Sequence, residues 1–266
     1  MYQKLPIGTN QPGLIVLLVD QSQSMTDPYG GTSKQDFAAL AVNRCIYEIM
    51  NACRSGEIIK DRCHIGVIGY GQNTDLLLGG RPSELGKEIK RTQVFKRKVP
   101  DGAGGLAEIE QKLPFWIEPG AQNGTPMEKG FDLVADLAQA WISENPHNFP
   151  PVVINITDGE PNSVAKAEAS ARKLLSLRTS DGTVLLLNAH IADSAGQEIT
   201  LPNNEDGLPN EYARLLFRIS SVLPEPMVNA AKNAGFAPDP GARGFVMNAG
   251  AETLTKLLVF GSAYAR

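Results

Sequence analysis

Residues 14–24 read Leu-Ile-Val-Leu-Leu-Val-Asp-Gln-Ser-Gln-Ser, an unbroken apolar run that ends in an acidic, hydroxyl-rich loop. Six consecutive apolar residues have the length of a β-strand and lack the alternation of a strand with one face in water. Such a run is typical of a parallel sheet that is covered on both faces. The stretch therefore predicts a central strand of an α/β fold, with polar residues at its carboxyl end.

Apolar runs of strand length alternate with stretches of helical periodicity through the rest of the chain. Residues 76–78 follow the strand expected at 63–70 so closely that an antiparallel hairpin is the economical connection. The order of strands and helices otherwise predicts parallel pairing. We expect an α/β, Rossmann-like doubly wound, mostly parallel sheet with one antiparallel edge strand and helices on both faces. The other strands are expected at 151–156, 183–191 and 244–247, and helices at 34–54, 126–141, 163–177, 211–220, 226–234 and 251–260.

No internal repeat or convincing linker divides the chain, so we expect residues 1–266 to form a single domain. Two regions elaborate the alternating pattern, at about 79–120 and 192–226. The first is a looser stretch with scattered glycines and a basic cluster at 96–98. The second begins with a polar loop, 192–210, which we expect to cover one end of the sheet.

Charge and composition exclude several classes of protein. The 25 basic and 29 acidic residues give a net charge of −4, so there is no global basic field to hold nucleic acid or an anionic membrane. No window supplies the run of about 20 apolar residues that a membrane span needs. Three cysteines cannot form a paired framework, which favours a reducing compartment. We expect a cytoplasmic protein that binds neither nucleic acid nor membrane.

Oxygen donors follow the strands in three loops. In an open α/β sheet, sites form at the carboxyl ends of strands, where the connections reverse direction. Two carboxylates and three hydroxyls, with no imidazole or thiolate, suit Mg²⁺, Mn²⁺ or Ca²⁺ and suit Zn²⁺ or copper poorly. Octahedral Mg²⁺ would keep an exchangeable position that a carboxylate from another molecule could fill. The candidate metal ligands are Asp20, Ser22, Ser24, Thr125 and Asp158.

These residues resemble the metal-ion-dependent adhesion site, or MIDAS, of von Willebrand factor type A domains. The family's Asp-x-Ser-x-Ser is similar to residues 20–24, its threonine to Thr125, and its Thr-Asp-Gly to residues 157–159. The resemblance covers about residues 13–260, and Gln23 departs from it because the family commonly has glycine there. It implies that Ser22, Ser24 and Thr125 touch the metal directly, with Asp20 and Asp158 often acting through water.

The resemblance implies a binding module in which the metal receives an Asp or Glu carboxylate from a protein partner. The extra regions at about 79–120 and 192–226 would then set which partner fits. The ending Thr-Asp-Gly-Glu-Pro, residues 157–161, resembles stand-alone bacterial A domains linked to tellurium-resistance and kinase–phosphatase gene clusters. On that basis we expect a bacterial multi-protein stress or defence-type system.

Two other functions remain open. Asp20 could be the nucleophile of a metal-assisted phosphohydrolase or phosphotransferase, although Gln21 and Ser22 stand where such enzymes want a second carboxylate. The chain could instead be a structural subunit that ignores the metal. Ser and Asp are also common in turns and helix caps. His190 ends an expected strand and could approach the site, but a structural role is favoured for it.

Overall fold

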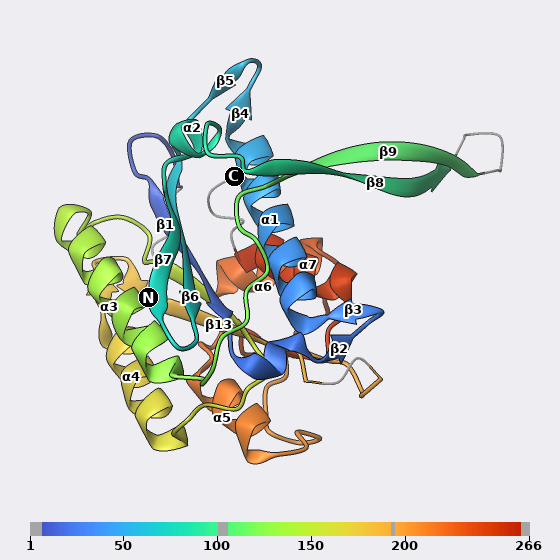
Figure 1. Ribbon diagram of the computed structural model, residues 1–266. Helices are drawn as coiled ribbons and strands as arrows, with labels where there is room; N and C mark the ends of the chain where they lie inside the picture. The colour runs from blue at the N-terminus through green and yellow to red at the C-terminus, as the bar shows by residue number, and fades with distance from the viewer. Residues whose placement is uncertain (1–6, 101–105, 193–194, 262–266) are drawn as a thin grey trace.

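Seven strands form one central sheet within residues 7–100, 106–192 and 195–261, the ranges that the computed structural model describes (Figure 1). Their order across the sheet is β14-β15-β13-β10-β1-β6-β7. The strands are β1 (Gly13–Asp20), β6 (Cys63–Tyr70), β7 (Thr74–Gly80), β10 (Val152–Thr157), β13 (Leu185–His190), β14 (Ile199–Thr200) and β15 (Phe245–Met247). The sheet therefore places the apolar run of residues 14–19 at its centre.

The pairing confirms the expected mostly parallel sheet. Strand β1 pairs in parallel with both β10 and β6, and β13 pairs in parallel with β10 and β15. Strand β7 pairs antiparallel with β6 at one edge, as the short connection predicts. Two residues of the polar loop, Ile199 and Thr200, add β14 antiparallel to β15 at the other edge.

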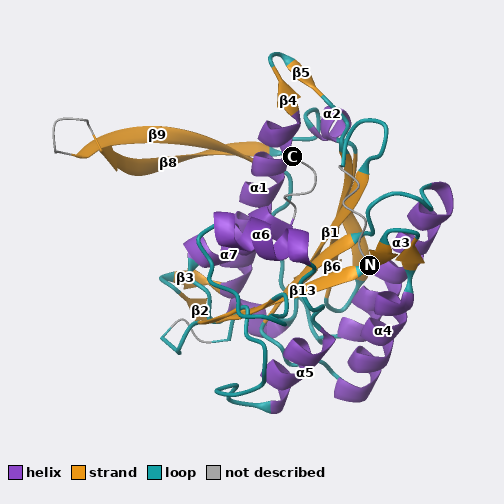
Figure 2. Ribbon diagram, turned by 180° about the vertical axis from the view of Figure 1, so that it is seen from behind, coloured by secondary structure: helices purple, strands orange, loops and turns teal. Residues whose placement is uncertain are grey.

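Helices cover both faces of the sheet, as Figures 1 and 2 show from opposite sides. Ile15, Leu17 and Val19 pack into the apolar cluster beneath α1, α6 and α7, and the alternate residues of β1 pack beneath α3, α4 and α5. Because both faces are buried, β1 has apolar residues at every position from Leu14 to Val19. The helices are α1 (Lys34–Cys53), α2 (Pro82–Leu85), α3 (Met127–Glu144), α4 (Val164–Ser176), α5 (Glu211–Ile219), α6 (Glu225–Asn233) and α7 (Ala251–Gly261).

Polar residues mark where three of these helices begin. The side chains of Ser33, Ser163 and Asn210 accept hydrogen bonds from backbone N–H groups in the first turns of α1, α4 and α5. Each cap satisfies a donor that the helix cannot pair internally. None of the helices in the described ranges has the length and apolar character that crossing a membrane requires.

The region 79–120 contains long regular strands that the sequence pattern did not predict. Strands β8 (Arg91–Pro100) and β9 (Leu106–Phe115) pair antiparallel over ten residues each and form a ribbon, here called the arm. The arm extends away from the rest of the molecule (Figures 1 and 2). At its root, Leu113 and Phe115 are buried, and Trp116 just beyond them donates from Nε1 to the carbonyl of Leu85 at 2.8 Å. The description of this region as a loose stretch was therefore wrong.

Three smaller two-stranded hairpins accompany the sheet and the arm in the described ranges. The hairpin of β2 (Pro28–Tyr29) and β3 (Thr32–Ser33) joins the loop after β1 to α1. That loop also contains a 3₁₀ helix, η1 (Gln23–Thr26). A second hairpin follows α1 and pairs β4 (Arg54–Ser55) with β5 (Ile58–Ile59). A third follows α4 and pairs β11 (Arg178–Thr179) with β12 (Gly182–Thr183). They bring the chain back to the start of β6 and β13.

Candidate metal centre

The candidate site lies where the sheet connections diverge. From β1 the chain passes through α1 to β6 on one side, whereas from β10 it passes through α4 to β13 on the other. Because β1 and β10 are parallel neighbours, their carboxyl ends lie side by side at this divergence. Such a switch point is where open α/β sheets form binding crevices. It brings Asp20, at the end of β1, next to Thr157 and Asp158, at the end of β10.

Asp20 is held by hydrogen bonds from both loops. Its Oδ1 accepts from the backbone N of Ser22 at 2.8 Å, and its Oδ2 accepts from Oγ1 of Thr157 at 2.6 Å. The hydroxyls of Ser22 and Ser24 lie 3.0 Å apart, within hydrogen-bond distance. Asp20 and Ser22 are 1% and 2% exposed, and Ser24 is half-buried. These contacts place the Asp-x-Ser-x-Ser side chains together beside Thr157.

The loop that contains Thr125 is tied to the loop after β10 by two hydrogen bonds with Asn162. The N–H of Thr125 donates to Oδ1 of Asn162 at 3.0 Å, and the N–H of Asn162 donates to the carbonyl of Thr125 at 3.0 Å. Gly124, with φ of +77°, turns the chain into this pairing. The three loops that were expected to meet at one end of the sheet therefore do meet there, and Thr125 is buried among them.

Asp158 is buried and only partly satisfied. Its Oδ2 lies 3.4 Å from Nζ of Lys34, and its Oδ1 has no hydrogen-bond partner among the described residues. His190, at the end of β13, lies with Nε2 2.7 Å from the carbonyl oxygen of Asp158. Since a carbonyl can only accept, Nε2 carries the proton in this contact, and burial lowers the pKa of His190, which favours the neutral ring. His190 thus supports the loop backbone, in line with the structural role expected for it.

The electrostatics of the pair of carboxylates favour a bound cation. Burial, and secondly the negative charge of Asp158, raise the pKa of Asp20 to about 7, although hydrogen bonds from Thr157 and Ser22 lower it. An unpaired buried carboxylate oxygen is costly unless a cation or a donor satisfies it. In the described ranges, no three His, Cys, Asp or Glu side chains form a group that could hold a metal ion. The candidate donors at this end of the sheet are two carboxylates and three hydroxyls. Hard oxygen donors of this kind fit Mg²⁺, Mn²⁺ or Ca²⁺.

Sequence reasoning missed three residues that shape the site. Lys34 and Asn162 gave no signal because a lysine at a helix start and an asparagine in a loop are ordinary. Gln21 is buried, and its side-chain amide packs against two glycines. A Cβ added to Gly69 would lie 2.3 Å from Oε1 of Gln21, and a Cβ added to Gly120 would lie 2.5 Å from its Nε2. The lack of a side chain at Gly69 and Gly120 was the signal in the sequence that could have indicated this packing.

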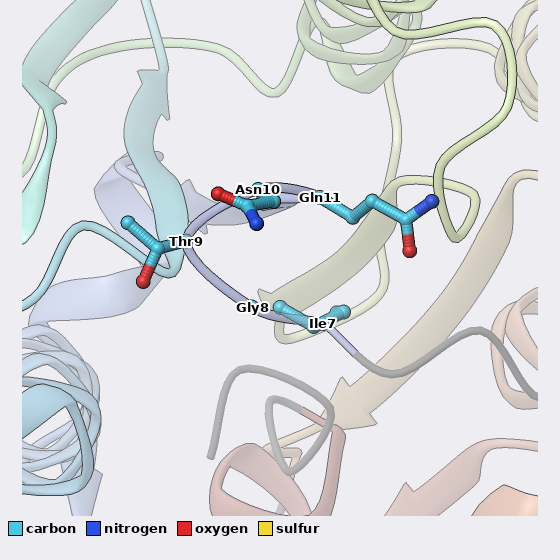
Figure 3. A pocket seen from close by; sticks show the side chains of 5 residues that line it. All are labelled: Ile7, Gly8, Thr9, Asn10 and Gln11. Atoms are coloured by element: carbon cyan, nitrogen blue, oxygen red, sulfur yellow. The ribbon is translucent and has the colours of Figure 1, made fainter.

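A hollow at the start of the described chain is separate from this site (Figure 3). It is lined by the turn Ile7–Gln11, in which the backbones of Gly8 and Gln11 bond to each other. Figure 3 shows the side chains of Thr9 and Gln11 pointing in opposite directions. The five residues carry no charge and do not converge on a ligand, so this hollow is no rival to the candidate metal centre.

No protein-family model matches the chain, and no curated protein matches its sequence. Among solved structures, the pilus adhesin SpaC from Lactobacillus rhamnosus GG matches 99% of this chain and 31% of its own, with 14% identity and a TM-score of 0.53. Likeness at this identity concerns the fold, and the strand order with three loops at one end of the sheet agrees with it. The chain has a von Willebrand factor type A fold.

Two further structures with weaker similarity to this chain were solved with metal. The mussel byssus protein PTMP1, with zinc in its MIDAS motif, matches 93% of this chain and 46% of its own, at 15% identity and a TM-score of 0.47. The manganese-loaded TRAP protein of Plasmodium vivax matches 71% of this chain and 60% of its own, at 17% identity and a TM-score of 0.38. The chain spans less than half the length of SpaC and of PTMP1.

Proposed function

We propose that this A domain is a divalent-metal-dependent protein-interaction module that captures an acidic side chain of a partner. The metal would be held by Asp20, Ser22, Ser24, Thr125 and Asp158, with Mg²⁺ as the first choice and Mn²⁺ or Ca²⁺ as alternatives. The observation that carries the proposal is the buried Oδ1 of Asp158, which has no hydrogen-bond partner among the described residues, beside the buried carboxylate of Asp20. When bound, the ion would supply a positive centre to which a carboxylate can attach.

The charges of the donor set support capture of an acid. Two carboxylates balance the charge of a divalent ion, while the hydroxyls of Ser22, Ser24 and Thr125 add no negative charge. An ion held this way stays electrophilic and would attract a partner's Asp or Glu. Thr157, hydrogen-bonded to Asp20 at 2.6 Å, orients that carboxylate and fixes the loop around it.

The enzyme alternative, with Asp20 as nucleophile, has less support. Both oxygens of Asp20 already accept hydrogen bonds, and the residue is 1% exposed. A nucleophile has to reach its substrate and usually needs a nearby base. We therefore propose a non-enzymatic role for residues 1–266 as one domain.

We propose that the two elaborated regions, at about 79–120 and 192–226, determine which partner fits. The first contributes the arm, and the segment that follows it leads directly to Thr125, with the N–H of Gln122 bonded to the carbonyl of Gln21. A partner bound at the metal would thus lie within reach of this segment. We further propose that the protein works in the cytoplasm, in a bacterial multi-protein stress or defence-type system.

The test is titration with Mn²⁺ and Mg²⁺ followed by calorimetry, on the parent chain and on Ser22→Ala/Ser24→Ala. We expect a binding heat in the parent that is lost in the double variant. Thr26→Ala, which removes a hydroxyl of the same loop outside the donor set, is the matched control and should bind like the parent. A parent chain that gives no heat with either ion, or a double variant that binds equally well, contradicts the proposal and favours the metal-independent structural subunit.

Partner capture is the second readout. Pull-downs with the tagged parent chain in EDTA, and again after added Mg²⁺, should recover a partner only with the ion present. Asp158→Asn should remove that capture while its circular dichroism spectrum stays that of the parent. Hydrolysis of a generic phosphate ester that disappears in Asp20→Asn would instead revive the enzyme alternative.

A further inference from the structure

Lys34 brings a positive charge into the candidate metal centre. It is the first residue of α1 and is only 7% exposed. Its Nζ lies 3.4 Å from Oδ2 of Asp158 and 3.7 Å from Oδ2 of Asp27. Asp158 is buried, whereas the side chain of Asp27 is 61% exposed. The Lys34–Asp158 pair is therefore the one that lies in a low-dielectric environment.

The position of Lys34 is unfavourable for a lysine on its own. The N-terminus of a helix carries partial positive charge, which repels a cation in the first turn. Burial of an ammonium group adds a desolvation cost unless a carboxylate compensates it. The partner that compensates it inside the protein is Asp158, so the fold accepts this lysine because of the site.

We infer that Lys34 is an internal counter-ion of the metal centre, which neutralises Asp158 when no divalent ion is bound and weakens binding of that ion. This inference rests on the proposed function, because it requires Asp158 to take part in holding the metal. An ammonium group and a divalent ion that share one carboxylate repel each other. The ion must either displace Lys34 from Asp158 or bind beside it, and both reduce its affinity.

The consequence concerns when the site is filled. A buried ammonium that satisfies one oxygen of Asp158 preserves the three-loop arrangement without metal. The same charge raises the metal concentration at which the site fills. A partner carboxylate brings a compensating negative charge, so metal and partner should each strengthen binding of the other. Lys34 would thus make occupancy of the site depend on the partner.

The experiment compares Lys34→Met, Lys34→Gln and Lys34→Arg with the parent chain, by Mn²⁺ titration in a calorimeter and by thermal unfolding with EDTA or saturating Mn²⁺. Loss of the charge should tighten Mn²⁺ binding on the order of tenfold, while Lys34→Arg should bind like the parent. The neutral variants should unfold at a lower temperature in EDTA and regain most of the difference in Mn²⁺. Lys166→Met, an exposed lysine on α4, changes the net charge equally and should leave the affinity unchanged.

The outcomes separate this inference from the proposed function. A parent chain that binds no Mn²⁺ overturns both. A parent chain that binds, with neutral variants that keep the parent's affinity or bind more weakly, overturns the role of Lys34 alone. If the neutral variants are unfolded in EDTA but fold in saturating Mn²⁺, this result supports the inference. Failure to fold even in saturating Mn²⁺ contradicts it, because Lys34 would then be required whether or not the ion is present.

Discussion

Thr157 joins two loops of the candidate metal centre through a single hydroxyl. Its Oγ1 donates to Asp20 and accepts from the backbone N of Gly159 at 2.9 Å. One small side chain therefore sets the orientation of a proposed ligand and the turn that carries Asp158. A group that acts through ligands in this way is expected to matter for metal affinity nearly as much as the ligands do.

Thr157→Val keeps the shape of the side chain and removes the hydroxyl. We expect Mn²⁺ affinity to fall by about 10- to 100-fold, because the Asp20 carboxylate loses the donor that orients it. Calorimetric titration measures this loss, and Thr157→Ser, which keeps the hydroxyl, should retain most of the affinity. Equal affinity in the valine and serine variants would show that the hydroxyl has no part in positioning Asp20.

Gly159 is required for two separate reasons. Its φ is +92°, a region that side-chain-bearing residues rarely adopt, and a Cβ there would lie 2.6 Å from Nε2 of His190. Gly31 offers a matched comparison, because its φ is +87° and an added Cβ there would meet none of the described residues within 4 Å, apart from its neighbours in the chain. The two glycines thus differ in contact and not in backbone conformation.

We expect Gly31→Ala to lower the free energy of unfolding by about 1–2 kcal/mol, the cost of the left-handed conformation alone. Gly159→Ala should cost more, because His190 must also move away from the carbonyl of Asp158. Urea unfolding of both variants measures the difference, and calorimetry should show weaker Mn²⁺ binding in Gly159→Ala only. Equal losses of stability in the two variants would mean that displacing His190 does not lower the free energy of unfolding.

At the scale of the element, strands with both faces buried are predictable and the arm is not. Residues 14–19 stand out because every position is apolar, and residues 63–70 stand out because His64 is the one charged or strongly polar residue among them; β1 and β6 match these stretches to within a residue. Strands β8 and β9 extend away from the core, so their residues need not follow the apolar pattern of a covered sheet. Burial of Leu113 and Phe115 at the root is too short a signal to indicate ten-residue strands.

Buried polar side chains are the second class that the sequence does not reveal. Asn43 lies inside α1 with no exposure, and its Oδ1 accepts from the backbone N of Trp116 at 2.7 Å and of Ile117 at 3.2 Å. It thereby fastens the root of the arm to the helix. In β10, Asn155 donates to Asn188 at 2.9 Å and accepts from the hydroxyl of Tyr70 at 3.1 Å. Each partner is distant in sequence, so periodicity carries no trace of these pairs.

The candidate site was predictable for a different reason. Asp20 and Asp158 follow directly after apolar strands, and parallel strands end at the same side of a sheet. The proximity of these two carboxylates could therefore be predicted from the topology of the sheet. Lys34 was not predictable, since its contact with Asp158 depends on how the β2–β3 hairpin turns the chain into α1, with the N–H of Lys34 bonded to the carbonyl of Asp27 at 3.0 Å.

At the scale of the whole molecule, the candidate metal centre and the arm are built from different strands. The centre is built on the carboxyl ends of β1 and β10, and the arm leaves the body beside α1 and reaches outward (Figure 2). The long strands of the arm bond to each other, and its root is held by Asn43, Trp116 and a pair between Arg91 and Glu118 at 2.9 Å. A two-stranded ribbon has little stability on its own, which suits an element that a partner completes.

Shortening the arm tests whether the arm selects the partner while the candidate metal centre binds the ion. Phe95 and Gln111 are register partners, so joining them by Asn-Gly, which favours a two-residue hairpin turn, removes the outer part and keeps the root. We expect the thermal unfolding midpoint and the Mn²⁺ affinity to stay within error of the parent chain, because no contact of the metal centre is touched. Metal-dependent capture of the partner should be lost or strongly reduced in pull-downs. Capture at the parent's level would show that the arm has no part in partner choice, and a change in Mn²⁺ affinity would show that arm and centre are coupled through α1.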